Sequence, residues 1–239
     1  MDSILEVRGA TKIFGGLAAN SDISFDVPRH SVVGIVGPNG AGKTTLFNSI
    51  SGAHPLTSGK ILFDGTDITK LKAYDVCRLG MGRTFQIPQS LNEMTVLENV
   101  LVAGIGRHKM SEALLRAEAV LEDLGLGKWK DSPAGTLNVV QKKHLEIARA
   151  VATEPKLLLL DETMAGLAGI ERVEAVKLIK RLNESGITIL MIEHVMEVVM
   201  NVSDKVVVLD GGKLLTEGTP EEIGNHEDVI RAYLGGKKW

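Results

Sequence analysis

The chain has 239 residues, 24% charged side chains and a formal net charge of −3, which suits one large domain or two modest ones. The slightly acidic balance and the aromatic content of 4% argue against a broad basic surface or a stacking platform for bases, so we expect no nucleic-acid partner. The single cysteine excludes an internal disulfide. We see neither a secretory signal nor an apolar run of the roughly 20 residues needed to span a membrane, and we therefore expect a cytoplasmic location.

Apolar patterning predicts strands at several places along the chain. Residues 4–8 and 23–27 alternate apolar and polar side chains, which is typical of half-buried strands. Continuous runs rich in Val, Ile and Leu are typical of strands that are buried on both faces of a mostly parallel sheet. Such runs lie at 31–37, 156–161, 187–193 and 205–210.

Helical periodicity separates these strands. Residues 111–125 and 169–186 carry apolar stripes at helical spacing, and each segment closes with glycine. Strands that alternate with helices predict an α/β architecture. The stretch from about 70 to 150 has a helical pattern with few β-branched runs, so we interpret it as a helical insertion on the sheet core.

A glycine-rich loop follows the strand predicted at 31–37 and precedes a helix. It reads "GPNGAGKTT" and fits the pattern G-x-x-x-x-G-K-T, in which backbone amides and the following helix start face phosphate oxygens. Lys43 is expected at the β- and γ-phosphates and the Thr44 hydroxyl on Mg²⁺. The predicted phosphate contacts are Gly37, Pro38, Asn39, Gly40, Ala41, Gly42, Lys43, Thr44 and Thr45.

This loop alone leaves the reaction open, because kinases, GTPases and motor ATPases share it. The N-K-x-D motif that GTPases usually carry is absent from the sequence. Asp161 and Glu162 end the strand predicted at 156–161, where open α/β sheets bind ligands. Asp161 suits Mg²⁺ and Glu162 suits the activation of a water molecule, with an acidic strand end facing solvent as the alternative.

Taken in order, these motifs resemble the nucleotide-binding subunit of an ABC transporter over nearly the whole chain. Phe14 in "KIFGG" matches the aromatic residue that stacks on adenine, and His194 in "MIEHVM" matches the switch histidine near the γ-phosphate. Gln86 in "GRTFQIPQ" matches the glutamine that contacts Mg²⁺ and the attacking water beside the docking place of the membrane subunit. The resemblance thus implies Glu162, His194, Gln86 and Lys43 as catalytic residues, with ATP and Mg²⁺.

The resemblance also implies a fold. We expect one ABC ATPase domain over 1–239, an α/β P-loop NTPase with a mostly parallel sheet, an antiparallel β subdomain and a helical subdomain. Its RecA-like core would cover about 1–70 and 150–239, and the helical subdomain about 70–150.

Several segments most resemble the branched-chain amino acid importer group, among them "GMGRTFQIPQSLNEMTVLENVLVA" and "LLTEGTPEEI". Importers of urea and short amides share these segments and stay an alternative. The resemblance implies membrane permease subunits as partners, a second ATPase subunit, and indirectly a periplasmic or extracellular solute-binding protein. It places the chain at the inner face of the cell membrane.

The sequence departs from the family at its signature, commonly Leu-Ser-Gly-Gly-Gln. Asn138 replaces the serine and Val139 and Val140 replace the glycines, whereas Gln141 is kept. In the family this segment reaches the γ-phosphate held by the other subunit, so Asn138 and Gln141 are candidate nucleotide contacts. Val140 would strain a left-handed backbone, or its methyl groups would obstruct a close approach.

We therefore expect a heterodimer in which one composite site hydrolyses ATP and the other mainly binds it, with a homodimer as the alternative. Two further classes of function stay open. A non-transport ABC ATPase usually has coiled coils or two cassettes, which this chain lacks. A nucleotide-binding regulatory subunit with weak turnover would fit the altered signature.

Overall fold

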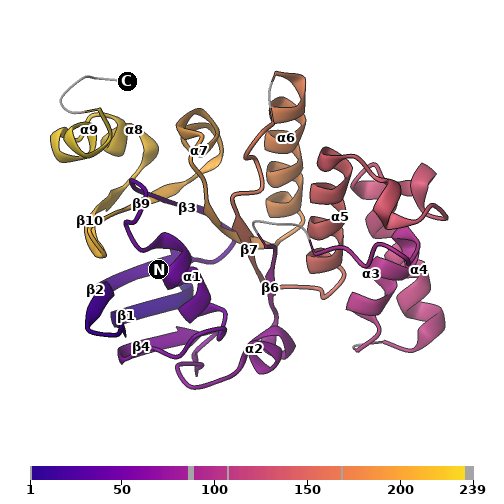
Figure 1. Ribbon diagram of the computed structural model, residues 1–239, viewed down its shortest axis with the longest axis horizontal. Coiled ribbons are helices and arrows are strands. Elements are labelled where there is room, and N and C mark those ends of the chain that lie inside the picture. Colours follow the sequence, from indigo (N-terminus) through magenta and orange to yellow (C-terminus); the bar gives the residue numbers. More distant parts are fainter. Residues whose placement is uncertain (1, 86–88, 107, 168, 235–239) are drawn as a thin grey trace.

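The computed structural model describes residues 2–85, 89–106, 108–167 and 169–234. A central sheet with strand order β10-β9-β3-β8-β7-β6 divides the molecule into layers (Figure 1). Its pairs are parallel except β9 with β10, which confirms the mostly parallel sheet expected from the apolar runs. The strands are β3 (Val32–Val36), β6 (Met81–Arg83), β7 (Leu157–Asp161), β8 (Thr188–Ile192), β9 (Lys205–Asp210) and β10 (Lys213–Gly218).

The central strands are apolar throughout because both of their faces are covered. Alternate residues of β7 belong to different cores: Leu158 and Leu160 pack on one side of the sheet, Leu157 and Leu159 on the other. Figure 1 shows α6 (Ile170–Glu184), α7 (Met196–Val202), α8 (Pro220–Gly224) and α9 (Glu227–Leu234) on one side. The helix α1 (Lys43–Ile50) and a second sheet lie on the other side.

The second sheet is antiparallel and has the order β2-β1-β4-β5. It contains the two segments predicted as half-buried strands, and their inward side chains pack with α1 and the central sheet. Its strands are β1 (Ser3–Phe14), β2 (Leu17–Pro28), β4 (Ser58–Phe63) and β5 (Thr66–Asp67).

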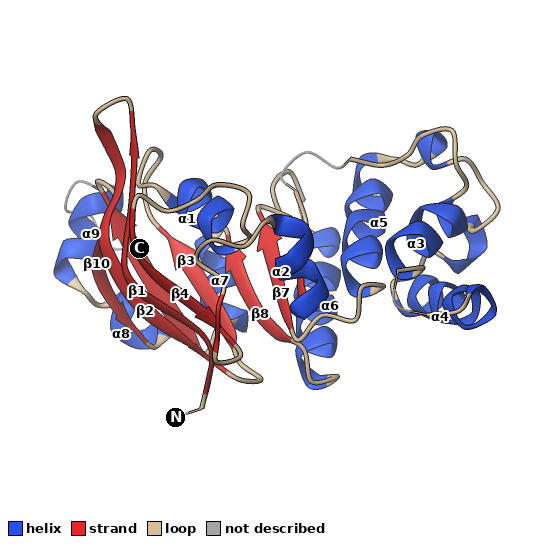
Figure 2. Ribbon diagram, turned by 90° about the horizontal axis from the view of Figure 1, so that it is seen from below, coloured by secondary structure: helices blue, strands red, loops and turns tan. Residues whose placement is uncertain are grey.

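Three further helices gather at one end of the molecule, where Figure 2 shows α3, α4 and α5 side by side. They are α3 (Val96–Gly104), α4 (Met110–Asp123) and α5 (Val139–Val151), with short 3-10 turns at Gly127–Trp129 and Ala134–Thr136. The predicted insertion at 70–150 thus contains helices, but it also contains α2 (Ala73–Leu79) and β6, and β6 pairs with β7 in the central sheet. The subdomain boundaries near 70 and 150 stay a prediction.

The two predicted helices form, with differences at their apolar stripes. In α4, Ala117 and Leu121 are buried, whereas Leu114 is exposed. In α6, Ile179 is buried, but Ile170 and Val173 are exposed. The stripe of α6 therefore extends past the packed interface, and the first turns of the helix leave apolar side chains in solvent.

We expect Leu121→Ala to lower the free energy of unfolding by about 2–5 kcal/mol, because it opens a cavity in the core shared by α3, α4 and α5. Leu115→Ala on the same helix is the control: its side chain is 68% exposed, so its effect should stay within about 0.5 kcal/mol. Urea denaturation measures both values. Equal losses for the two variants would contradict the burial of Leu121 in this core.

Candidate active site

The glycine-rich loop joins the end of β3 to the start of α1, in the order that the sequence predicts. Two of its glycines cannot be replaced by a residue with a side chain without a steric clash. A Cβ on Gly37 would overlap the carbonyl oxygen of Leu209, and a Cβ on Gly42 would overlap the Ala19 carbonyl and the Asn20 amide. Gly42 also has φ of 92°, the left-handed conformation that glycine adopts at little cost. The loop is thus held tightly against neighbouring backbone.

An open cavity of about 480 Å³ lies over this loop. Besides the loop, its walls come from the start of β2, the turn between β9 and β10, and the loops that follow β7 and β8. Of the predicted phosphate contacts, all line the cavity except Gly37 and Pro38, which lie at the start of the loop. The lining residues are Leu17, Ala18, Ala19, Asn39, Gly40, Ala41, Gly42, Lys43, Thr44, Thr45, Glu162, His194, Gly211 and Gly212.

Lys43 begins α1, and its side chain crosses the loop. Its Nζ donates to the carbonyl oxygens of Gly37 at 2.7 Å and Pro38 at 3.0 Å. Burial lowers the pKa of Lys43, and the negative charge of Glu162 opposes that shift. The ammonium group is therefore held at the cavity with little solvent around it, where it attracts an anion strongly.

Strand register brings the carboxylate pair to the same edge. Asp161 lies opposite Ile192 in the parallel pair of β7 and β8, so the residues after both strands are neighbours. Glu162 has φ of 50°, and its amide donates to the Ile192 carbonyl at 2.9 Å. A hydrogen bond of 2.6 Å joins Nε2 of His194 to Oε1 of Glu162. Both side chains line the cavity, which brings together two of the predicted catalytic residues.

Asp161 is buried behind this pair. Its Oδ2 accepts from Nη2 of Arg83 at 3.1 Å, and among the described residues its buried Oδ1 has no hydrogen-bond partner. Burial raises the pKa of Asp161, whereas the Arg83 charge lowers it. Arg83 was not among the residues predicted from the sequence, although it stands three residues before the predicted Gln86.

The donors present fit a magnesium ion bound with a nucleotide. Mg²⁺ prefers oxygen ligands from one or two side chains together with phosphates, and Asp161 Oδ1 and the Thr44 hydroxyl are such oxygens. Gln86, the third predicted ligand, lies outside the described residues.

The altered signature begins α5. Asn138 is the residue before the helix: its Oδ1 accepts from the Gln141 amide at 2.9 Å, and its own amide donates to Gln141 Oε1 at 2.9 Å. This capping box stabilises the helix start. Because Val140 lies in the first turn of a right-handed helix, the left-handed backbone considered for it is wrong. Neither Asn138 nor Gln141 lines the cavity of its own chain.

The two valines differ in their surroundings. The Val139 side chain is 70% exposed, whereas Val140 is partly buried and packs against the core under α5. Val139, rather than Val140, therefore presents the methyl groups that a partner would meet.

Phe14 stands at the end of β1, where it pairs with Leu17 across the hairpin. Its ring is 46% exposed, with Lys12 Nζ 4.8 Å from the ring centroid and His54 packed edge-on. Phe14 does not line the cavity, but Leu17 does. Its predicted stacking on adenine stays a prediction.

Two buried charged residues that the sequence analysis missed hold the segment after Glu162. Glu193, directly before His194, accepts from the Met164 amide at 2.7 Å. Lys143 of α5 donates to the Ala165 carbonyl and lies near the Glu193 charge. Burial raises the pKa of Glu193 to about 7. The sequence feature that could have identified Glu193 is its position directly before His194, the candidate switch histidine.

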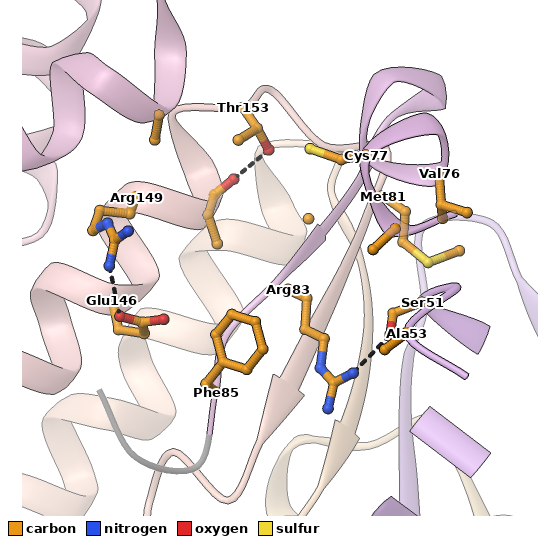
Figure 3. A pocket seen from close by; sticks show the side chains of 14 residues that line it. Ser51, Ala53, Val76, Cys77, Met81, Arg83, Phe85, Glu146, Arg149 and Thr153 are labelled. Carbon is orange, nitrogen blue, oxygen red and sulfur yellow. Dashed lines mark hydrogen bonds and ion pairs between the residues drawn. The ribbon is translucent and has the colours of Figure 1, made fainter. Parts of the chain in front are cut away.

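A second pocket, of about 260 Å³, lies between α2, β6 and α5. Figure 3 shows Arg83 and Phe85 reaching into it from the end of β6, opposite Glu146 and Arg149 of α5. Phe85 is half exposed and directly precedes Gln86. The pocket is therefore lined by the residue that directly precedes Gln86 in the sequence.

Comparisons with known proteins agree with this geometry. A family model described as ABC transporter matches residues 20–165, and one described as branched-chain amino acid ATP-binding cassette transporter matches residues 213–238. The high-affinity branched-chain amino acid transport ATP-binding protein BraF of Pseudomonas aeruginosa is 42% identical, with 97% of this chain and 98% of that protein covered. LivG of Escherichia coli, of the same description, is 41% identical with the same coverage.

Solved structures give the same result for the fold. The ADP conformation of an ATP-binding cassette of an ABC transporter superposes with a TM-score of 0.88 and 34% identity, covering 98% of this chain and 100% of that one. The expected P-loop ABC ATPase fold is thus confirmed.

The raised pKa of Glu193 predicts a pH-dependent stability. The pKa of Glu193 in the folded protein, about 7, exceeds its ordinary value of 4.5. The stability that this carboxyl group contributes is therefore fully present below about pH 4.5 and is lost as the pH rises to about 7. Glu193→Gln should therefore unfold like the parent near pH 5 and become more stable than it above pH 7.5, by on the order of 2–3 kcal/mol.

Urea denaturation from pH 5 to 8.5 measures this difference. Glu184→Gln, at an exposed position of α6, is the control and should keep the parent's pH profile. A constant difference between Glu193→Gln and the parent at every pH would contradict the shifted titration.

Proposed function

We propose that this chain, which belongs to the ABC transporter family, is the ATP-hydrolysing subunit of an importer for branched-chain amino acids. The observation that carries the proposal is the meeting of Lys43, Glu162 and His194 over the glycine-rich loop. The substrate class rests on full-length relatives named for branched-chain amino acid transport and on the match at residues 213–238. Uptake of urea or short amides is the alternative within the same importer type.

The geometry supports hydrolysis through positioning and charge. The loop amides, the start of α1 and Lys43 would hold the phosphates. Thr44 and Asp161 would hold a magnesium ion bound with the nucleotide, and that ion would supply positive charge at the phosphate oxygens. Glu162 would accept the proton of the attacking water at its carboxylate, and His194, hydrogen-bonded to that carboxylate, would orient it and stabilise charge at the γ-phosphate.

We place the membrane subunit at the second pocket. None of the described helices is long and apolar enough to cross a bilayer, so the transport step needs a partner that does. The pocket offers apolar contacts at Phe85, Val76 and Met81 beside charged Arg149 and Glu146. Such a surface suits a short amphipathic segment of a permease. In this arrangement the chain lies peripherally at the inner face of the membrane.

The signature segment supports a different ATPase subunit as the second partner. In a sandwich dimer Val139 would face the partner's nucleotide, where the family has glycine. The side chain of Asn138 keeps its NH₂ group as a donor, because the capping box uses only the oxygen of that side chain. We infer that this chain gives its partner a weakened signature while keeping its own loop, Glu162 and His194 complete. A regulatory subunit with weak turnover is the alternative that the same valines favour.

Glu162→Gln tests the hydrolytic role. We expect ATP turnover to fall by about 10²–10⁴-fold, because the amide cannot accept the water's proton, while nucleotide affinity stays within about two-fold. The steady-state phosphate release rate and a binding titration measure these values on the same preparation. Glu184→Gln serves as the control with unchanged turnover. A Glu162→Gln variant as active as the parent would exclude the proposed chemistry.

The valine substitutions test the weakened signature. We expect the lone chain to hydrolyse ATP slowly, and Val139→Gly to raise its turnover at high protein concentration by about ten-fold or more, because one obstructed charge-stabilising donor costs about 10²–10³ in rate. Val140→Gly is the matched comparison and should give no such gain, because Val140 packs inward. Fast, cooperative turnover of the unmodified lone chain would refute the asymmetry.

A further inference from the structure

Arg83 stands between the second pocket and the nucleotide cavity. It ends β6, and its side chain is 11% exposed. Its guanidinium makes a fork: Nη1 donates to Ser51 Oγ at 2.6 Å, and Nη2 donates to Asp161 Oδ2 at 3.1 Å. Ser51 follows α1, the helix that begins at Lys43. The arginine therefore ties the far end of the phosphate-loop helix to the carboxylate that suits magnesium.

The same side chain forms part of the second pocket. Figure 3 shows Arg83 beside Phe85, with its bond to Ser51 at the pocket wall. The guanidinium carbon lies 5.4 Å from the ring centroid of Phe85 and 5.9 Å from that of Phe47, distances at which cations and aromatic faces attract. Phe47 is buried, whereas Phe85 is half exposed in the pocket. A partner that displaces Phe85 would thus remove one of the two rings that hold Arg83.

We propose that Arg83 is a positioning residue that fixes Asp161 for magnesium and transmits occupancy of the second pocket to it. The inference rests on the proposed function, because it takes the pocket as the docking place of the permease. The coupling runs from the pocket to the cavity: contact of a partner at Phe85 shifts Arg83, and the shift of Arg83 changes how Asp161 presents its oxygens. By linkage, magnesium nucleotide at the cavity must alter the pocket in return.

The chemistry of arginine supports this role. Its planar, permanently charged fork reaches two acceptors at once, whereas lysine offers one point charge. Both Asp161 and Arg83 are largely removed from water, so the ion pair is weakly screened and the loss of one member leaves the other poorly compensated. A hydrogen bond to Oδ2 also leaves Oδ1 of Asp161 without a protein partner among the described residues, and hence available to a cation.

Magnesium dependence of binding tests the link to Asp161. A non-hydrolysable ATP analogue is titrated into the parent chain, Arg83→Gln and Arg83→Lys, each with magnesium chloride and with a chelator. In both variants we expect affinity with magnesium to fall about ten-fold, as for a lost charge-assisted hydrogen bond, while affinity in chelator stays within about two-fold. Equal changes in both buffers, or none, would overturn the inference.

Two further variants keep this test decisive. Arg149 lines the same pocket without contacting Asp161, so the Arg149→Gln variant should bind the ATP analogue like the parent in both buffers. Ser51→Ala removes the other end of the fork and should weaken magnesium-dependent binding by about two- to three-fold, which preserves a readout if Arg83→Gln does not fold. A parent chain that binds no nucleotide in either buffer would refute the proposed function itself.

The coupling to the pocket has its own readout in Cys77. This residue lines the pocket and is the single cysteine of the chain, so N-ethylmaleimide reports on that wall alone. We expect the analogue with magnesium to change the labelling rate of the parent and of Arg149→Gln by about two-fold or more, and to leave that of Arg83→Gln unchanged. The same change in Arg83→Gln would overturn the transmission through Arg83.

Discussion

The site depends on one constraint, the parallel alignment of β3, β8 and β7. Because parallel strands end at the same edge, the residues that follow them meet there: the phosphate loop after β3, Glu162 after β7 and His194 after β8. The register of Asp161 with Ile192 sets the distance at which Glu162 and His194 form their hydrogen bond. If β7 slipped by one residue against its neighbours, Asp161 would turn toward the opposite face of the sheet and separate from Arg83.

The features predictable from sequence were those with local causes. Strands β3, β7, β8 and β9 were predicted because long runs of branched apolar residues require burial on both faces. The glycine-rich loop was predicted because its pattern is typical of a phosphate-binding turn between a strand and a helix. The structure adds the steric reason for Gly37 and Gly42, where a Cβ would overlap neighbouring backbone. Asp161 and Glu162 followed from their place at a strand end.

What the sequence did not predict depends on contacts between distant segments. β6 has three residues, too few for a periodic pattern, and exists because it pairs with β7. Arg83, Lys143 and Glu193 gain meaning only where the fold brings them to Asp161 and to the segment after Glu162. The backbone strain predicted for Val140 is wrong, because the capping box of Asn138 and Gln141 begins a regular helix there. Burial, which a sequence does not state, distinguishes Val139 from Val140.

Buried titratable groups gather near the cavity: Lys43 lines it, Arg83 pairs with Asp161 next to Glu162, and Glu193 and Lys143 hold the segment after Glu162. Each is costly to bury, so each is held by hydrogen bonds or an opposite charge.

The proposed roles of these residues all require that the glycine-rich loop binds a nucleotide. The most direct measurement is a calorimetric titration of the purified chain with magnesium ATP, beside Lys43→Ala. The account predicts one nucleotide bound per chain and at least about ten-fold weaker binding by Lys43→Ala; no binding by the parent chain, or equal binding by both, would contradict it.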